Sequence, residues 1–383
     1  MTPPVSTSSV QKRARSPLPR RLLVTGGAGF IGSAFVRLCH RQGRVSGDAD
    51  SGHCIVLDAM TYAGDRDRLT TVLDASRPTQ LVVGDICDRA LVDHLLRKHE
   101  IEAIVHFAAE SHVDRSISGP APFIQTNVVG TFTLLDAFRQ HWDACGQPAH
   151  YRFLHVSTDE VYGSLAPDAP ATSEHSPYAP NSPYAASKAG SDHLVRAYSR
   201  TYGLPTLITH CANNYGPYQY PEKLIPLMFI NMLLGRSLPI YGDGQQRREW
   251  IHVDDHCDAL LALLELGEPG ESYNIGTTDE MTNLALVEVL CDLMDRQGIP
   301  LPIAPCRQLI QFVRDRPGHD RRYSLNCTKL YHELGWHPKI SLETGLKDTL
   351  TWYLTHRSWW EKLLSGDYQT YYQQQYGSRT SAP

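Results

Sequence analysis

Residues 22–32 read Leu-Leu-Val-Thr-Gly-Gly-Ala-Gly-Phe-Ile-Gly, and this stretch decides the fold. An apolar run leads directly into glycines at positions 26, 29 and 32, and a helical pattern follows over residues 33–41. This order predicts a strand, a glycine-rich turn and a helix. Gly26 and Gly29 would let the backbone approach a pyrophosphate at the helix N-terminus, and Gly32 would let helix and strand pack closely. A lone glycine triad can also be a purely structural turn, so the rest of the chain must decide.

The same alternation of apolar runs and amphipathic helices continues downstream. The predicted strands are residues 53–58, 80–86, 103–109, 152–156 and 206–210, and the predicted helices are residues 90–99, 126–139 and 184–202. Such alternation is typical of an α/β protein with a doubly wound parallel (Rossmann) sheet. We expect residues 21–210 to form this dinucleotide-binding domain, completed by segments that return from later in the chain.

Ligands of such sheets bind outside the carboxyl ends of the strands. Gly26, Asp58, Asp85, Ala108 and Thr158 all fall at those predicted ends. Asp58 is placed to accept hydrogen bonds from an adenosine ribose, and its charge would repel a 2′-phosphate, so NAD is favoured over NADP. A polar insert at residues 45–52 lengthens the usual interval between the glycines and this acid.

Tyr184 and Lys188 are four residues apart on a predicted helix, and therefore on one face of it. A nearby ammonium stabilises a phenolate, so we expect the pKa of Tyr184 to fall from about 10 towards neutral. Such a phenol could take the proton of a sugar hydroxyl while a hydride leaves the same carbon. The alternative is an exposed tyrosine beside an exposed lysine, which the glycine turn upstream disfavours.

Asp159 and Glu160 directly follow a predicted buried strand, and two adjacent carboxyls exceed what alcohol oxidation needs. A pair whose pKa values are pushed apart can supply both an acid and a base. Once C4 of a hexose is a ketone, the C5 proton is acidic, so this pair could remove it and protonate the departing C6 hydroxyl. The alternative is a solvated loop pair without a chemical role.

The composition argues against several other classes of protein. The 383 residues carry a net charge of −5, which gives no electrostatic footprint for nucleic acid. No uncharged apolar run approaches the roughly 18 residues of a membrane span. The nine cysteines stand singly with no Cys-x-x-Cys, so we expect free thiols, a cytoplasmic protein and no metal site. Residues 1–20 could imitate a transit peptide, but their prolines favour a disordered tail, and residues 378–383 form a second tail.

Taken together, several segments resemble the extended short-chain dehydrogenase/reductase superfamily that acts on nucleotide sugars, and within it the dTDP-glucose 4,6-dehydratase family. The resemblance extends from Leu22 to about Gly377. Its segments are TGGAGFIGS (25–33), AAESHVDRS (108–116), TNVVGT (126–131), STDEVYG (157–163), YAASKA (184–189), NNYGPY (213–218), PEKLIPL (221–227) and RPGHDRRY (316–323). The glycine turn and Tyr-x-x-x-Lys identify only the superfamily, whereas Thr-Asp-Glu and the last three segments are narrower.

The resemblance implies conversion of dTDP-glucose to dTDP-4-keto-6-deoxy-glucose and water, as in deoxysugar biosynthesis of the dTDP-rhamnose type. It implies a homodimer that keeps its NAD, with Asp159 as acid, Glu160 as base and Thr158 bonded to the sugar near C4. A UDP-glucose 4,6-dehydratase stays open, because the residues alone do not specify the base. A 4-epimerase would keep Tyr184 and Lys188 but has no use for the acid–base pair, and a cofactor-sensing binding protein would be free to lose either residue.

The resemblance and the pattern together define two expected sets of contacts. The cofactor set is Tyr184, Lys188, Gly26, Gly29, Phe30, Ile31, Gly32, Asp58, Thr61, Asp85, Ile86, Phe107, Ala108, Ala109, Ser111, Thr126 and Asn214. The substrate set is Ser111, Thr158, Asn213, Lys223, Leu224, Pro239, Ile240, Tyr241, Arg248, Asn283, Asp315, Arg316 and His319. Arg248 suits a diphosphate, because a guanidinium fork matches phosphate oxygens.

The second half of the chain is less regular and richer in proline. We expect residues 211–377 to form mainly a smaller α/β lobe that binds the nucleotide sugar. Its predicted helices are residues 229–235 and 284–296, and its aromatic end, residues 359–376, should fold back on the lobe.

Overall fold

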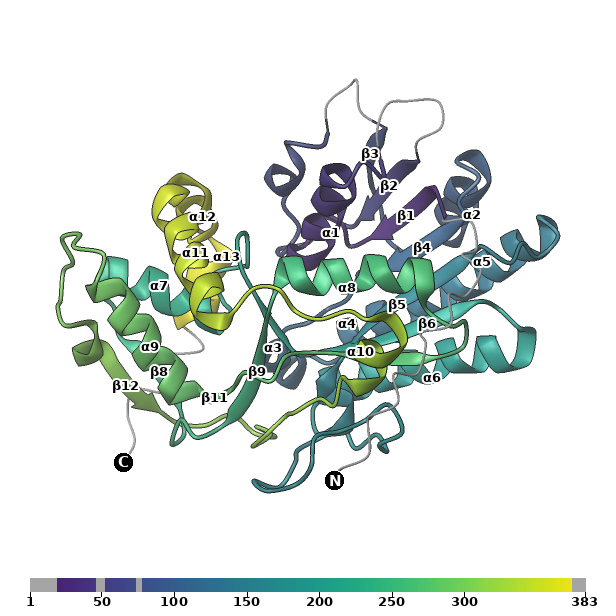
Figure 1. The fold of residues 1–383 in the computed structure, drawn as a ribbon. Helices are drawn as coiled ribbons and strands as arrows, with labels where there is room; N and C mark the ends of the chain where they lie inside the picture. Colours follow the sequence, from purple (N-terminus) through teal and green to yellow (C-terminus); the bar gives the residue numbers. More distant parts are fainter. Residues whose placement is uncertain (1–18, 46–51, 74–77, 374–383) are drawn as a thin grey trace, which may run out of the picture.

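The computed structural model describes residues 19–45, 52–73 and 78–373, and its centre is a seven-stranded sheet in the order β10-β6-β5-β4-β1-β2-β3 (Figure 1). The strands are β1 (Arg21–Thr25), β2 (His53–Asp58), β3 (Thr79–Val83), β4 (Ala103–His106), β5 (Arg152–Thr158), β6 (Thr206–Cys211) and β10 (Ser272–Ile275). All neighbouring strands pair in parallel. The predicted doubly wound parallel sheet is confirmed.

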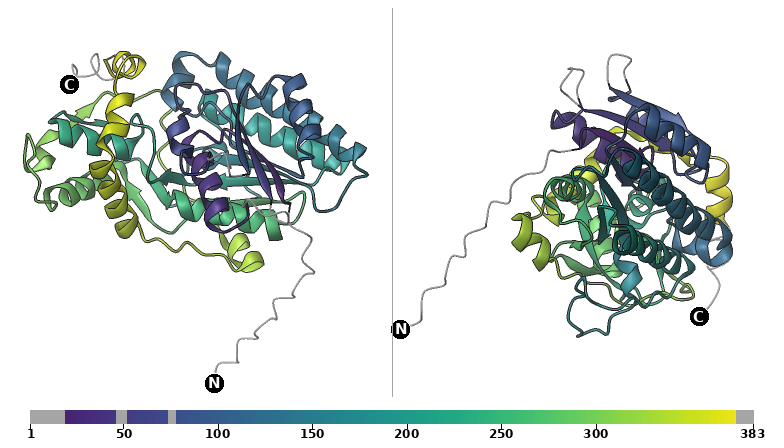
Figure 2. Two further views of the ribbon diagram at one scale, coloured as in Figure 1. Left: turned by 90° about the horizontal axis from the view of Figure 1, so that it is seen from above. Right: turned by 90° about the vertical axis from the view of Figure 1, so that its right-hand side faces the viewer.

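Helices cover both faces of this sheet (Figures 1 and 2). Helices α1 (Phe30–Arg41) and α8 (Val253–Leu266) pack together on one face, and α2 (Arg89–Lys98), α5 (Thr131–Ala144) and α6 (Pro183–Tyr202) cover the other. Successive side chains of a strand point to opposite faces. In β1, Leu22 and Val24 therefore enter the core beneath α1 and α8, and Leu23 enters the core beneath α2 and α5. Because both faces are buried, the strand reads as a continuous apolar run.

The second half of the chain builds a smaller lobe with two small sheets. One contains β11 (Glu280–Thr282), β9 (Arg247–His252) and β7 (Asn213–Tyr215), and the other contains β12 (Ile310–Val313) and β8 (Leu238–Tyr241). Helices α7 (Leu224–Leu234), α9 (Asn283–Asp295), α11 (Leu342–Thr355) and α12 (Arg357–Leu363) enclose a second apolar core with these sheets. Strand β10 and helix α8 nevertheless belong to the large sheet, and the domain boundary at residue 210 stays a prediction.

Short elements complete the connections of the described chain. They are η1 (Arg66–Leu69), α3 (Val113–Ser118), α4 (Ala121–Phe123), η2 (Ile124–Gly130), η3 (Asp159–Tyr162), η4 (Cys306–Leu309), α10 (Thr328–Leu334) and α13 (Asp367–Tyr372). Trp359, Trp360 and Tyr372 pack on the core of the smaller lobe, as predicted for the aromatic end. Residues 1–18 of the N-terminal tail expected at residues 1–20, and the tail expected at residues 378–383, lie outside the described residues. Among the residues described, no helix combines the length and apolar character that a membrane span requires.

Several predicted boundaries were wrong for identifiable reasons. Strand β3 stops at Val83 because its partner β2 stops at Asp58, and β4 stops at His106 because β1 ends in the glycine turn. The helix predicted from residue 126 begins as a π-helical turn, η2, and continues as α5. Helix α7 begins at Leu224 and not at residue 229, since Pro226 sits in its first turn, where proline costs little.

Candidate active site

The glycine turn joins β1 to α1 at the carboxyl edge of the sheet. Gly26 has φ +68°, and a Cβ there would lie 2.6 Å from the backbone nitrogen of Ala108 on the neighbouring strand connection. A Cβ on Gly32 would lie 2.3 Å from the Gly26 carbonyl oxygen, so α1 packs directly against the turn. Gly29 is the N-cap of α1 and no side chain caps this end. The first backbone N–H groups of α1 are therefore left for an anion.

Asp58 ends β2 beside this turn. Its Oδ2 accepts a hydrogen bond from the Ala28 nitrogen at 2.9 Å, and its Oδ1 accepts one from the Met60 nitrogen at 2.8 Å. Burial raises the pKa of Asp58, and these hydrogen bonds oppose that rise. Val45 and Gly52, which flank the polar insert, pair at the opposite end of β2. The two residues that flank the insert thus lie away from Asp58, and residues 46–51 lie outside the described ranges.

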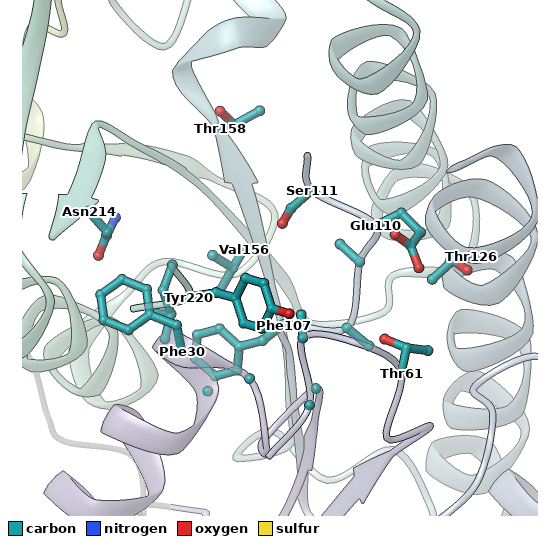
Figure 3. Close-up of a pocket in the computed structure, with 18 of the residues that line it drawn as sticks. Phe30, Thr61, Phe107, Glu110, Ser111, Thr126, Val156, Thr158, Asn214 and Tyr220 are labelled. Atoms are coloured by element: carbon teal, nitrogen blue, oxygen red, sulfur yellow. The ribbon is translucent and has the colours of Figure 1, made fainter. Parts of the chain in front are cut away.

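A cavity of about 360 Å³ opens at the carboxyl ends of the strands. Every predicted cofactor residue and all five predicted catalytic residues, Thr158, Asp159, Glu160, Tyr184 and Lys188, line it. In Figure 3, Asn214 and Phe30 lie on one side of this cavity and Thr61 and Thr126 on the other, with Thr158 at the top of the view. The structure thus brings together residues that lie far apart in the chain, from Gly26 to Lys223.

The predicted substrate residues divide into two groups. Ser111, Thr158, Asn213 and Lys223 line the cavity. The others lie beyond its lining, and they are Leu224, Pro239, Ile240, Tyr241, Arg248, Asn283, Asp315, Arg316 and His319. The side chain of Ile240 belongs to the apolar core of the smaller lobe, so any ligand contact of this residue would come from its backbone.

Two polar members of the outer group, Tyr241 and Arg316, bond to Asp114 of α3. Asp114 accepts hydrogen bonds from the Tyr241 hydroxyl at 3.1 Å and from Arg316 Nη1 at 3.3 Å. His319 Nδ1 lies 2.6 Å from an Asp315 carboxylate oxygen. This network therefore ties the smaller lobe to the motif that follows β4.

Tyr184 and Lys188 lie on α6, which begins where the Ser182 hydroxyl accepts from the Ala185 nitrogen at 3.1 Å. The Lys188 ammonium donates to the Val156 carbonyl oxygen at 2.9 Å. The expected lowering of the pKa of Tyr184 was wrong for the protein chain by itself. Burial raises this pKa, the charge of Glu160 raises it further, and the hydrogen bond with Thr158 lowers it. The surroundings that the chain provides therefore disfavour the phenolate of Tyr184.

Asp159 and Glu160 occupy the turn η3, where they differ in surroundings. Asp159 is buried; its Oδ1 accepts from the Thr158 hydroxyl at 3.2 Å, and its Oδ2 has no hydrogen-bond partner. Burial, and next the charge of Glu160, raise the pKa of Asp159 well above its usual value. Burial also raises the pKa of Glu160, but the cations of Arg316, Arg248 and Lys223 act against this. Asp159 is thus suited to hold a proton and Glu160 to accept one.

Several cavity residues were missed by the sequence reasoning, among them Arg68, Glu110, Gln219, Tyr220 and Glu222. Glu110 and Glu222 stand inside segments that had already been singled out, next to Ser111 and Lys223. Arg68 had no sequence signal. Its guanidinium is buried behind the glycine turn, where Nη1 donates to the Ala28 carbonyl oxygen at 3.0 Å.

Comparison with known proteins places this site in a family. Residues 23–349 match the family model described as GDP-mannose 4,6 dehydratase. The chain is 50% identical to a dTDP-glucose 4,6-dehydratase of Neisseria meningitidis serogroup B, covering 91% of this chain and 98% of that protein. It is 51% identical to one of Xanthomonas campestris pv. campestris, covering 91% of this chain and 97% of that protein.

Solved structures agree with the sequence matches. The dTDP-glucose 4,6-dehydratase DesIV of Streptomyces venezuelae, solved with NAD and dTDP bound, gives a TM-score of 0.81 at 50% identity, over 90% of this chain and 99% of that chain. A UDP-glucose 4-epimerase of Thermotoga maritima, solved with UDP-glucose, gives 0.74 at 29% identity, over 88% of this chain and 99% of that chain. The predicted resemblance is confirmed.

Proposed function

This chain belongs to the dTDP-glucose 4,6-dehydratase family, within the broader group that the GDP-mannose 4,6 dehydratase model describes, and from that membership we propose its reaction. It is an NAD-dependent lyase that converts dTDP-glucose to dTDP-4-keto-6-deoxy-glucose and water. The reaction oxidises C4, eliminates water across C5 and C6, and returns the hydride to C6.

The residues present fit NAD. The turn at Gly26, Gly29 and Gly32 leaves no room for a Cβ at two of its three glycines, and the adjacent N-terminus of α1 is open to a pyrophosphate. Asp58 would accept hydrogen bonds from the adenosine ribose and repel a 2′-phosphate. When bound, NAD⁺ supplies the acceptor for the C4 hydride, the donor that returns it to C6, and a positive charge near Tyr184.

The chain itself moves the protons. Tyr184 takes the proton of the C4 hydroxyl as the carbonyl forms, which makes the C5 hydrogen acidic. Glu160 then removes the C5 proton while Asp159 gives a proton to the departing C6 oxygen, so water leaves. When the hydride reaches C6, Glu160 returns its proton to C5.

This cycle leaves Tyr184 with one proton more and Asp159 with one proton fewer than at the start. The Thr158 hydroxyl donates to Asp159 and also hydrogen-bonds Tyr184. Transfer of a proton through this hydroxyl restores both residues, so each cycle balances without an outside acid or base.

The single observation that carries this proposal is the adjacent pair Asp159 and Glu160 in unequal surroundings, in one cavity with Tyr184. A 4-epimerase inverts C4 by oxidation and reduction at that carbon and does not need this pair. The pair therefore favours a dehydratase over the epimerases that share the fold.

The test uses the purified holoenzyme with dTDP-, UDP- and CDP-glucose, and it follows the alkali-induced chromophore of the 4-keto product. We expect dTDP-glucose to react at least about tenfold faster than the others, with no added oxidant. Faster reaction of UDP-glucose would make the chain a UDP-glucose 4,6-dehydratase. Release of a sugar that keeps its C6 alcohol, or consumption of one external oxidant per turnover, would overturn the proposed reaction.

We also propose that the chain forms a homodimer and works in the cytoplasm. An exposed apolar surface supports the homodimer, and the free cysteines support the cytoplasm. Ile124, Val129, Phe132 and Tyr202 expose apolar surface on η2, α5 and α6, which pack side by side. Such a surface suits a second copy of the chain, and sedimentation velocity of Phe132→Glu against wild type tests it. The nine cysteines, all within the described residues, are free thiols, as a reducing compartment allows.

A further inference from the structure

A fully buried arginine lies behind the glycine turn. Arg68 of η1 is 1% exposed and contributes to the lining of the cavity. Its Nη1 donates to the carbonyl oxygens of Ala28, at 3.0 Å, and Ala63, and its Nε donates to the Tyr218 carbonyl oxygen at 3.1 Å. Burial of a guanidinium is costly unless its donors find acceptors. The three bonds offset this cost and hold the side chain in one position.

Two of these carbonyl groups belong to the two halves of the expected cofactor site. Ala28 lies in the glycine turn, and its N–H donates to Asp58 at 2.9 Å, so the turn is held at both ends of this residue. Ala63 lies in the loop after β2, which also carries Thr61 in the cavity lining (Figure 3). Because one nitrogen of Arg68 binds both carbonyl oxygens, the turn and the loop are held at a fixed separation.

The third carbonyl group belongs to the smaller lobe. Tyr218 has φ +69°, a conformation that a tyrosine keeps only where its surroundings fix it. Arg68 binds its carbonyl oxygen, and the guanidinium of Arg37 lies 4.7 Å from the centre of its ring. The next residue, Gln219, lines the cavity. Arg68 thus connects the two halves of the cofactor site to a third wall of the same cavity.

The partners of Arg68 are main-chain groups. Among the described residues, no carboxylate accepts a hydrogen bond from this guanidinium, and its Nη2 has no hydrogen-bond partner. Burial lowers the pKa of Arg68 to about 10, with the charge of Asp65 acting against this, so the group is a cation at neutral pH. The side chain therefore bridges segments of backbone and is not one half of a buried ion pair.

NAD needs both of the segments that Arg68 joins. Its pyrophosphate would lie at the glycine turn, and its adenosine ribose would lie at Asp58, at the start of the loop after β2. A site whose parts are already in place binds more tightly than one that must be ordered by its ligand. In the proposed reaction the reduced cofactor must also stay bound until it returns its hydride, so slow release matters for turnover.

We propose that Arg68 is a positioning residue for the cofactor. By bridging the glycine turn, the loop after β2 and the Tyr218 segment, it fixes the two halves of the NAD site before NAD binds and slows the release of NAD. This inference rests on the NAD site of the proposed function and not on the identity of the sugar.

A tie between the two lobes is the competing explanation, since Arg68 also contacts Tyr218 and lies 5.4 Å from the Trp359 ring. Trp359→Phe separates the two explanations. It removes the hydrogen bond from Trp359 to Asp65 that joins the lobes, and it leaves the three bonds of Arg68 in place. If the lobes alone hold the cofactor, loss of either residue should release NAD faster.

The experiment measures NAD release without turnover. Purified holoenzyme carrying radiolabelled NAD is mixed with excess unlabelled NAD, and the bound label is followed over time. We expect Arg68→Met to release NAD at least about tenfold faster than wild type. Trp359→Phe should release NAD at the wild-type rate, and so should Arg66→Met, which removes an exposed arginine from the same turn. Wild-type release by Arg68→Met, or release by Trp359→Phe as fast as by Arg68→Met, overturns the proposal.

Arg68→Lys covers the case in which Arg68→Met does not fold. The ammonium keeps the charge, but its donors share one nitrogen and cannot reach three carbonyl oxygens as the guanidinium fork does. We expect release at least about threefold faster than from wild type, and the wild-type rate would overturn the proposal. No sugar nucleotide is used, so failure of the proposed reaction is seen separately, as a lack of turnover in an enzyme that retains NAD.

Discussion

In the proposed reaction, the neighbours Asp159 and Glu160 have opposite tasks. An acid can protonate a leaving hydroxyl only if it keeps its own proton near neutral pH, and a base must have lost its proton. Burial and the adjacent charge raise the pKa of Asp159, while Arg316, Arg248 and Lys223 offset the effect of burial on Glu160. The two pKa values differ because of the surroundings of the carboxyls and not because of the side chains themselves. Replacement of one carboxyl by an amide should therefore stop one step of the reaction and leave the other steps intact.

Glu160→Gln should stop turnover and leave oxidation at C4 detectable. The amide cannot accept the C5 proton, so we expect kcat to fall by about 10²–10⁴-fold. Transfer of deuterium from C4-labelled dTDP-glucose to the cofactor should persist, and solvent deuterium should not enter C5. Full dehydration by this variant would show that another group is the base.

Asp159→Asn should fail one step later. Glu160 still removes the C5 proton, so solvent deuterium should enter C5 of the 4-keto sugar, but the C6 hydroxyl leaves slowly without a proton donor. We expect a loss of about 10²–10⁴-fold in water release, measured by mass spectrometry of the sugar. If Asp159→Asn and Glu160→Gln give the same labelling pattern, the separate roles are wrong.

At the scale of elements, the glycine turn shows what local sequence can specify. The spacing of its glycines, the strand before it and the helix after it could all be predicted from the sequence, because each depends on residues that are close in sequence. Arg68 and Tyr220 line the cavity because of tertiary packing. No local sequence pattern predicts such contacts. Arg248 on β9 lowers the pKa of both carboxyls, whereas Arg316 after β12 and Lys223 also oppose the effect of burial on Glu160, so sequence indicated the pair but not its pKa values.

Gly26→Ala tests whether the glycine turn requires the absence of a Cβ, and Gly43→Ala is the matched control. Gly26 and Gly43 have φ values of +68° and +67°, but a Cβ on Gly26 meets Ala108 whereas a Cβ on Gly43 meets nothing within 4 Å. Both changes carry the strain of a left-handed alanine, about 1 kcal/mol. Gly26→Ala should cost about 1–3 kcal/mol more because backbone must move, and it should bind NAD more weakly. Urea unfolding measures the stability of the two variants, and titration with NAD measures their affinity for the cofactor. Equal stability and equal affinity would show that a Cβ on Gly26 does not clash with Ala108.

At the scale of the whole molecule, segments from late in the chain return to the large sheet and connect the two lobes. Strand β10 extends the sheet beside β6, and Trp359 of α12 donates to Asp65 beside η1 at 2.7 Å. The segment after His319 crosses between the lobes, where Thr172 pairs with Leu325 and Arg247 pairs with Arg322. The sequence predicted returning segments but not their partners, because strand pairing over such separations depends on the assembled sheet.

Glu249 on β9 lies at that crossing and should make stability depend on pH. It accepts from the Ser324 hydroxyl at 2.7 Å and the Leu325 nitrogen at 3.0 Å, but burial outweighs these bonds and raises its pKa to about 7. A folded-state pKa above the unfolded value gives stability that is complete below about pH 4.3 and is lost as pH rises through 7. The loss attributable to this group is about 3 kcal/mol.

Glu249→Gln cannot release a proton, so its free energy of unfolding should fall less between pH 5 and pH 8 than that of wild type. Urea unfolding of the holoenzyme at both pH values measures the difference. The exposed Glu343 in the first turn of α11 provides the control, because Glu343→Gln removes a carboxyl of the same kind from solvent. If wild type and Glu249→Gln lose the same stability over this range, Glu249 is already charged in the folded protein, and the crossing of the two lobes is held by an ordinary carboxylate.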